Sequence, residues 1–145
     1  MRPIIFRAKR KDNGEWVEGD FVSNKYILQG YRVERGFVVP YNAFEVVPET
    51  VGQYTGLKDK NGKKIFEGDI IKAITVDTNA EQIAVVKFGH FHDDNGDEDF
   101  IGFYIEFNGV TVTICQLLLE EVKERFEVIG NIHDNPELLE EQGND

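Results

Sequence analysis

Two histidines, His90 and His92, are the residues whose type and spacing come closest to those of a metal site. Alternate residues of a strand point to the same face, so these imidazoles could share an ion with carboxylates of the acidic stretch 93–99. No third ligand follows at a required spacing, and the stretch fails the EF-hand pattern because Glu98 occupies the glycine position. We predict no bound metal or other cofactor. We interpret 93–99 as a solvated loop, with a weak cation site as the alternative.

Covalent chemistry has one candidate nucleophile, Cys115, the single cysteine of the chain. It lies within an apolar stretch, Val110 to Leu119, where neighbouring side chains keep a thiol protonated, so we interpret it as a packing residue. The chain has no Gly-x-Ser-x-Gly, Walker A or Gly-x-Gly-x-x-Gly motif. The sequence therefore predicts no catalytic residue and a protein that is not an enzyme.

Paired carboxylates occur twice, in Glu18-Gly19-Asp20 and in Glu67-Gly68-Asp69. Each follows an Asn-Gly pair, so the segment 11–22 returns as the segment 58–71. A repeated pattern is more typical of a turn than of a reaction centre, because glycine permits a positive φ and aspartate can accept backbone N–H bonds. The predicted structural turn residues are Asn13, Gly14, Gly19, Asp20, Asn61, Gly62, Gly68, Asp69, Asn108 and Gly109.

Basic residues gather near a tryptophan at the start of the chain. Such a cluster could bind single-stranded nucleic acid by phosphate pairing and stacking, or bind a protein partner. Charges that protect an edge strand are the structural alternative. The candidate binding residues are Arg7, Lys9, Arg10, Lys11 and Trp16.

The net charge of −11 disfavours nucleic acid as the main partner. Its distribution is uneven: residues 1–72 carry +3, and residues 73–145 carry −14. A slightly positive half could pack against the acidic half of another copy, which suggests a homo-oligomer. Alternatively, the acidic half could present carboxylates to the DNA-binding groove of a host protein. We expect no membrane association, because no apolar run approaches the length of a membrane span.

Short extended segments separated by turns must position these residues. The clearest is a hairpin whose Asn108-Gly109 turn places Phe107 opposite Val110, Ile105 opposite Val112 and Phe103 opposite Ile114. Strands are also predicted over 4–9, 51–57, 64–66, 70–76, 82–91 and 126–132, and short strands broken by turns over 30–48. Residues 116–125 fit a helix or a strand.

The pattern predicts a mainly β fold of two small, closely packed units, SH3-like or curled-sheet barrels, with one or two short helices near the C-terminus. The expected units are an N-terminal β unit over residues 1–50 and a barrel-like unit over 51–145. The second unit would contain the acidic loop 93–99 and a terminal helix over 136–142, which Asn135 and Pro136 introduce.

Three segments resemble the YopX family: Ile5 to Ala8, Val47 to Ile70, and Val128 to Leu139. The middle segment contains Gly52-Gln53-Tyr54-Thr55-Gly56-Leu57 and Glu67-Gly68-Asp69-Ile70. By this resemblance the chain is similar to small β-rich proteins from bacteriophages, prophages and Gram-positive bacteria, which have no established activity. The resemblance implies a phage or prophage origin and supplies no catalytic residue. Together with the lone cysteine, which cannot form a disulfide within the chain, it suggests a cytoplasmic protein in the host cell.

Overall fold

The computed structural model describes residues 4–74, 80–92, 99–107, 110–113 and 124–140. The chain divides into two compact units, Met1–Tyr54 and Thr55–Asp145. The division predicted from the sequence, between residues 50 and 51, lies just before this point. The boundary falls inside a strand, so that strand contributes residues to both units.

The first unit is an antiparallel sheet with the strand order β4-β3-β2-β1-β5. Its core consists of Ala8, Ile27 and Val46, against which partly buried aromatic and aliphatic side chains pack. Alternate residues of β1 and β2 point toward this core, because successive side chains of a strand point to opposite faces of the sheet. The elements are β1 (Phe6–Lys9), β2 (Trp16–Val22), β3 (Tyr26–Glu34), β4 (Phe37–Glu45), the 3₁₀ turn η1 (Pro48–Thr50) and β5 (Gly52–Lys58).

The second unit contains two three-stranded antiparallel sheets, ordered β11-β10-β9 and β12-β7-β8, and the pairing of β5 with β6. Its elements are β6 (Lys64–Phe66), β7 (Asp69–Ile74), β8 (Glu81–Val85), β9 (Lys87–His92), β10 (Asp99–Phe107), β11 (Val110–Thr113), β12 (Phe126–Asn131) and the helix α2 (Glu137–Glu140). The core residues are Leu57, Ile65, Ile71, Ala84, Val86, Phe103 and Ile105.

The prediction of a mainly β fold is confirmed, and so is the short terminal helix after Asn135-Pro136. Within the described ranges no sheet closes into a barrel, so the SH3-like or curled-sheet barrel description is too specific. The hairpin register is confirmed where it is described, because Phe107 pairs with Val110 and Ile105 with Val112. The turn at Asn108-Gly109 and the pairing partner Ile114 lie outside the described residues.

The predicted strand over 82–91 is in fact two strands that separate at Val86. Val86 is 1% exposed, and its backbone pairs with the turn before β7: its N–H donates to Asp69 O, and its carbonyl accepts from Gly68 N. At Val86 the chain passes from the sheet β12-β7-β8 to the sheet β11-β10-β9. Of the segment 116–125, only Glu124 and Arg125 are described, and both are helical.

The repeated segments share a glycine-containing hairpin but differ after it. Gly14 and Gly62 both have positive φ angles, +74° and +80°. An Asn-Gly pair is typical of a two-residue type I′ turn, but the first loop is longer: the Arg10 N–H donates to the Glu15 carbonyl oxygen, and four residues lie between them. Only one left-handed residue is needed in such a longer loop.

The two Glu-Gly-Asp segments fold differently. Gly68 has a φ of +92° in the turn before β7, and the buried Asp69 accepts a hydrogen bond from Phe66 N at 2.8 Å. Gly19, by contrast, lies in the middle of β2, so the predicted turn at Gly19-Asp20 is wrong. A Cβ at Gly19 would lie 2.2 Å from the carbonyl oxygen of Leu28 on β3, so glycine is required there for close strand approach.

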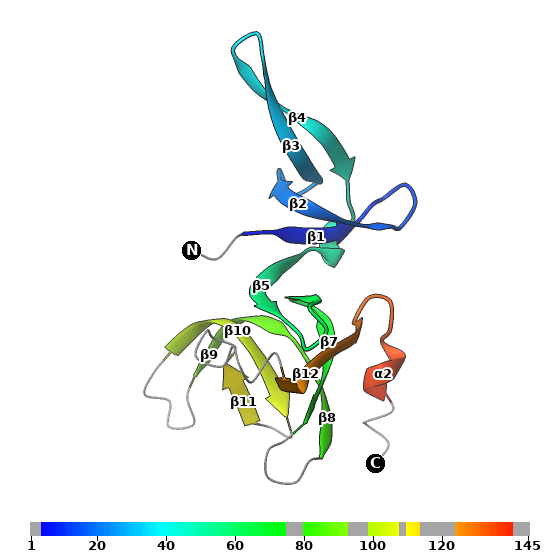
Figure 1. Cartoon of the computed structure of the whole chain (residues 1–145), viewed down its shortest axis with the longest axis vertical. Helices are drawn as coiled ribbons and strands as arrows, with labels where there is room; N and C mark the ends of the chain where they lie inside the picture. The colour runs from blue at the N-terminus through cyan, green and yellow to red at the C-terminus, as the bar shows by residue number, and fades with distance from the viewer. Residues whose placement is uncertain (1–3, 75–79, 93–98, 108–109, 114–123, 141–145) are drawn as a thin grey trace. The chain divides into compact units, whose positions relative to one another are not determined.

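Residues 30–48, predicted as short strands broken by turns, instead form most of one long hairpin, β3–β4. We call residues 29–42 of this hairpin the arm. Figure 1 shows it as a two-stranded ribbon that extends beyond β1 and β2 of its own unit. The reversal occurs at Arg35 and Gly36, both with positive φ (51° and 82°), between the paired residues Glu34 and Phe37. Positive φ at both central residues is the geometry of a type I′ turn.

Candidate interaction surface

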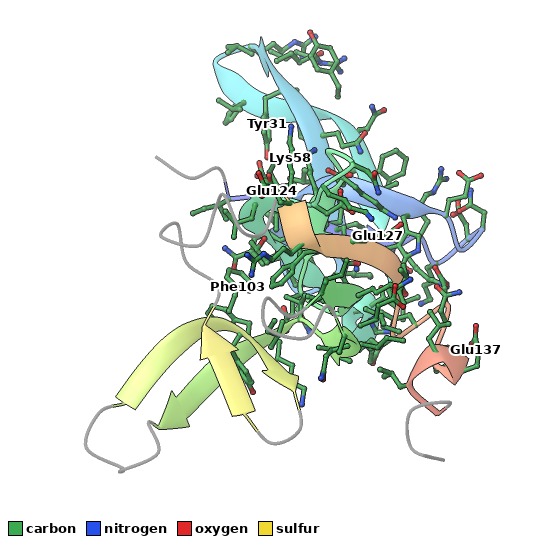
Figure 2. All side chains as sticks on the ribbon, turned by 60° about the horizontal axis from the view of Figure 1, so that its bottom comes forward. Tyr31, Lys58, Phe103, Glu124, Glu127 and Glu137 are labelled. Atoms are coloured by element: carbon green, nitrogen blue, oxygen red, sulfur yellow. The ribbon has the colours of Figure 1, made fainter. Side chains whose placement is uncertain are left out.

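The arm is the part of the described chain where large apolar side chains gather at the surface. Two-stranded ribbons have little room for a core, so side chains on both of their faces meet solvent. In Figure 2 the arm's side chains, including Tyr31, stand out from the ribbon. The exposed fractions are 45% for Tyr31, 75% for Val33, 72% for Phe37, 69% for Val38 and 62% for Tyr41.

One face of the arm is apolar beyond the paired residues Gln29 and Asn42 at its base. Val33 lies directly opposite Val38, and Tyr31 lies directly opposite Pro40. Directly opposed residues of antiparallel strands share a face, and so do residues two apart on one strand. These four residues, which we call the apolar face, form the pattern of a sheet surface that is covered by another layer.

The opposite face of the arm is mixed. Arg32 lies opposite Val39 and Glu34 opposite Phe37, so the two charged residues that the arm has within β3 fall on this side. The Arg32 guanidinium is 3.1 Å from the Glu34 carboxylate and 5.6 Å from the ring centre of Tyr41. The ion pair remains solvated at the surface, and the apolar face carries no charge.

Polar contacts with β2 fix the base of the arm. The Tyr31 hydroxyl donates a hydrogen bond to the Asp20 carboxylate, which raises the pKa of Tyr31 above its ordinary value. The Gln29 side-chain amide donates to the Glu18 carbonyl oxygen at 2.8 Å. These contacts hold the first part of the arm against its neighbour strand, and the residues beyond Tyr31 project freely.

The structure brings only part of the predicted basic cluster together. Arg7 and Lys9 alternate on β1 and lie over the Trp16 ring, at 4.8 Å and 5.5 Å from its centre. Arg10 lies instead over Phe44 at 4.6 Å and pairs with Asp12. Trp16 is therefore already covered by cations of its own chain, and the cluster is divided between different surroundings.

Lys11 belongs to a third arrangement, around Glu45 at the end of β4. The Glu45 carboxylate lies 3.2 Å from the Lys11 amine and 3.4 Å from the Lys25 amine. The hydrogen bond from Lys11 is the largest cause that lowers the pKa of Glu45, and Lys25 adds to it. This carboxylate joins the loops on either side of β2 to the last residue of β4.

The metal candidates His90 and His92 occupy β9 positions opposite Ile101 and Asp99 of β10. Within the described part of the chain, no group of three or more His, Cys, Asp or Glu residues could hold a metal ion. The acidic stretch 93–98 and Cys115 lie outside the described residues. Asn61 and Gly62 lie in the loop between β5 and β6, where the carboxylate of Asp59 orders the turn.

Sequence reasoning missed the arm as a functional feature. Its signal was present in the alternation of Tyr31 and Val33 with charged residues, followed by Arg35-Gly36 and the apolar run Phe37 to Val39. Alternation of this kind predicts a strand with one apolar face, but it does not say whether that face is covered.

The fold and this surface define a small β protein with a projecting apolar hairpin. In the described residues, no helix has the length and apolar character needed to cross a membrane. The family model described as YopX protein matches residues 5–140, and the chain belongs to the YopX family. Among solved structures, the chain is similar to the crystal structure of protein EF1440 from Enterococcus faecalis. The TM-score is 0.60 and the identity 25%, and the match covers 96% of this chain and 99% of that one. Comparison with curated proteins finds no match.

Proposed function

We propose that this chain is a non-enzymatic phage or prophage protein that acts in the host cytoplasm through protein contacts, as a homo-oligomer. The exposed arm is the observation that carries the proposal. Val33 and Val38 are each more than two-thirds exposed and lie directly opposite each other in the ribbon. Contiguous apolar surface of this kind marks interaction sites in soluble proteins, because solvent exposure of such patches is unfavourable.

The architecture of the arm supports the same conclusion. Two strands alone are marginally stable in water, and stability normally requires a third strand or a packed layer. The arm has contacts with β2 only at its base, through Asp20 and Glu18. A protein partner on the arm would supply the missing layer.

The phage or prophage origin and the cytoplasmic location rest on other observations. The chain belongs to the YopX family, and the resemblance of its sequence segments to that family implies a phage or prophage origin. Its single cysteine suits a reducing compartment. The oligomer also follows from the charge distribution, since a basic half could meet the acidic half of another copy.

Site-specific photo-crosslinking in the host cell tests the proposal. A photoreactive amino acid replaces Val38 on the arm, and a matched variant carries it at Asn13, which is exposed on the β1–β2 loop. We expect protein adducts at Val38 and few or none at Asn13. Absence of protein adducts at Val38 and at Val33, a second position on the same face of the arm, would refute action through this surface.

The nucleic-acid alternative has one supporting observation, the grouping of Arg7 and Lys9 around Trp16. Titration with single- and double-stranded oligonucleotides at low salt, read by Trp16 fluorescence, decides between the two functions. Saturable quenching that weakens as salt rises would favour nucleic-acid binding. The acidic-mimic alternative depends on Asp93 to Asp99, and deletion of this loop with recovery of host partners tests it.

A further inference from the structure

We propose that the apolar face of the arm packs against the same face of a second copy, in an antiparallel dimer with two-fold symmetry. This inference rests on the proposed function and names the partner and the surface. Val33 and Val38 would lie at the symmetry axis, with Tyr31 and Pro40 beside them. Each arm would then provide the layer that the other one lacks.

The distribution of charge on the arm favours its own copy as the partner. A two-fold interface brings one surface against itself, so a charge within it would meet the same charge. The apolar face has none, because Arg32 and Glu34 lie on the other face, where they pair with each other. Two apolar faces can therefore meet without burial of a charge.

The ends of the arm are complementary in charge. Arg35 lies at the tip of the arm and forms no ion pair with another described residue. Asp20 lies at the base, where its carboxylate accepts the Tyr31 hydroxyl. Residues 31 and 35 lie at equal sequence distance on either side of residue 33. An antiparallel arrangement centred on Val33 therefore places each Arg35 next to the partner's Asp20.

Pro40 selects face-to-face packing over extension of the sheet. The outer edge of β4 is the unpaired edge of this unit's sheet, and Pro40 removes a backbone donor from its centre. A second arm that paired along this edge would lose a ladder hydrogen bond at Pro40. Contact through side chains requires no backbone donor.

The size of the interface sets the expected strength. Stable complexes use about 20–30 residues from each partner, and smaller contacts are typical of weak, transient association. The arm offers only a few residues from each copy, so the dimer will depend on protein concentration. Sedimentation equilibrium of the full chain over a wide concentration range is the appropriate measurement.

Two matched variants separate the faces of the arm. Val33→Glu places a carboxylate on the apolar face, and Phe37→Glu places one on the opposite face at almost the same exposure, 75% against 72%. We expect Val33→Glu to weaken the dimer by at least about tenfold, the effect of losing a central interface contact. We expect Phe37→Glu to dimerise like the unaltered protein. Circular dichroism confirms that each variant is folded.

A charge swap tests the proposed pairing of tip and base. Arg35→Glu and Asp20→Arg should each weaken the dimer, and the double variant should recover most of the loss because it restores opposite charges. A general effect of net charge would not show this recovery. Failure of the double variant to recover overturns the antiparallel arrangement.

The remaining outcomes distinguish this inference from the proposed function. A chain that stays monomeric at all concentrations overturns the arm-to-arm dimer and the homo-oligomer, and heterologous crosslinks at Val38 would then still support action through protein contacts. Self-association that Val33→Glu leaves unchanged overturns the arm as the interface while the oligomer stands. A dimer sensitive to Phe37→Glu alone places the interface on the wrong face and also overturns the inference.

Discussion

Replacement of Asp59 by asparagine should destabilise the second unit markedly. Asp59 is 3% exposed, and its carboxylate accepts three backbone N–H bonds, each of 2.9 Å. Two come to Oδ1 from Asn61 and Lys63 in the loop, and one comes to Oδ2 from Val128 within β12. The side chain thus joins the β5–β6 loop to a strand almost seventy residues later.

An asparagine that keeps its oxygen toward the loop must direct its NH₂ group at the Val128 N–H, so a donor meets a donor. Loss of one hydrogen bond to a charged group costs about 1.5–3 kcal/mol, and an unsatisfied buried amide costs about 1–3 kcal/mol. Since these effects overlap, we expect a loss of about 2–4 kcal/mol in the free energy of unfolding. The thermal midpoint would fall by roughly 5–15 °C for a chain of this size.

Urea unfolding followed by circular dichroism measures the loss, and amide hydrogen exchange locates it. Exchange should accelerate most at Val128, Asn61 and Lys63. The repeat provides a matched control, because Asp12 occupies the corresponding loop of the first unit but is exposed and pairs with the Arg10 side chain. Asp12→Asn should leave the midpoint unchanged. Equal effects of the two substitutions, or an Asp59→Asn protein as stable as the original, would refute the reasoning.

Three further predictions concern the first unit. Gly19→Ala should destabilise it by about 1–3 kcal/mol or more, because the new methyl group would collide with a backbone carbonyl of β3, and Gly89→Ala in β9 provides a comparison in open space without a positive φ; equal urea midpoints would contradict this. The lysines beside Glu45 lower its pKa, so its contribution to stability should be complete above the ordinary pKa of glutamate and be lost as pH falls through the lowered folded value. Glu45→Gln should remove this part of the acid dependence, and unchanged acid unfolding would count against it. Tyr31 should ionise at a higher pH than an ordinary tyrosine, as absorbance difference titration against Tyr31→Phe can show, and Asp20→Asn should reduce the shift; a Tyr31 that titrates normally would exclude the hydrogen bond.

Local patterns in the sequence were sufficient to predict much of the fold. The register of β10 and β11 followed from the alternation of Phe103, Ile105 and Phe107, because a slip of one residue would expose that whole face. The terminal helix followed from Asn135-Pro136. Asparagine is a preferred N-cap residue, and proline suits the first helical position because the N–H that it lacks would have no partner within the helix. In each case the information lies within a few neighbouring residues.

The same local patterns failed where distant residues decided the conformation. Glu18-Gly19-Asp20 and Glu67-Gly68-Asp69 have the same sequence but opposite roles, since Gly19 accommodates a carbonyl of β3 within a strand and Gly68 turns the chain. The break at Val86 is also non-local, because it depends on hydrogen bonds to the turn before β7. A tripeptide does not specify which strand lies beside it.

The sequence by itself determined many of the strands, the turns that contain Gly62 and Gly68, and the family, because alternation, glycine positions and motif spacing are properties of short segments. Only the tertiary structure decided which apolar residues are covered. On one face of β3, Ile27 is buried in the core and Val33 is exposed to solvent, although both are large aliphatic residues of the same strand. Burial depends on whether another layer lies above a face, and in the arm none of the described chain provides one.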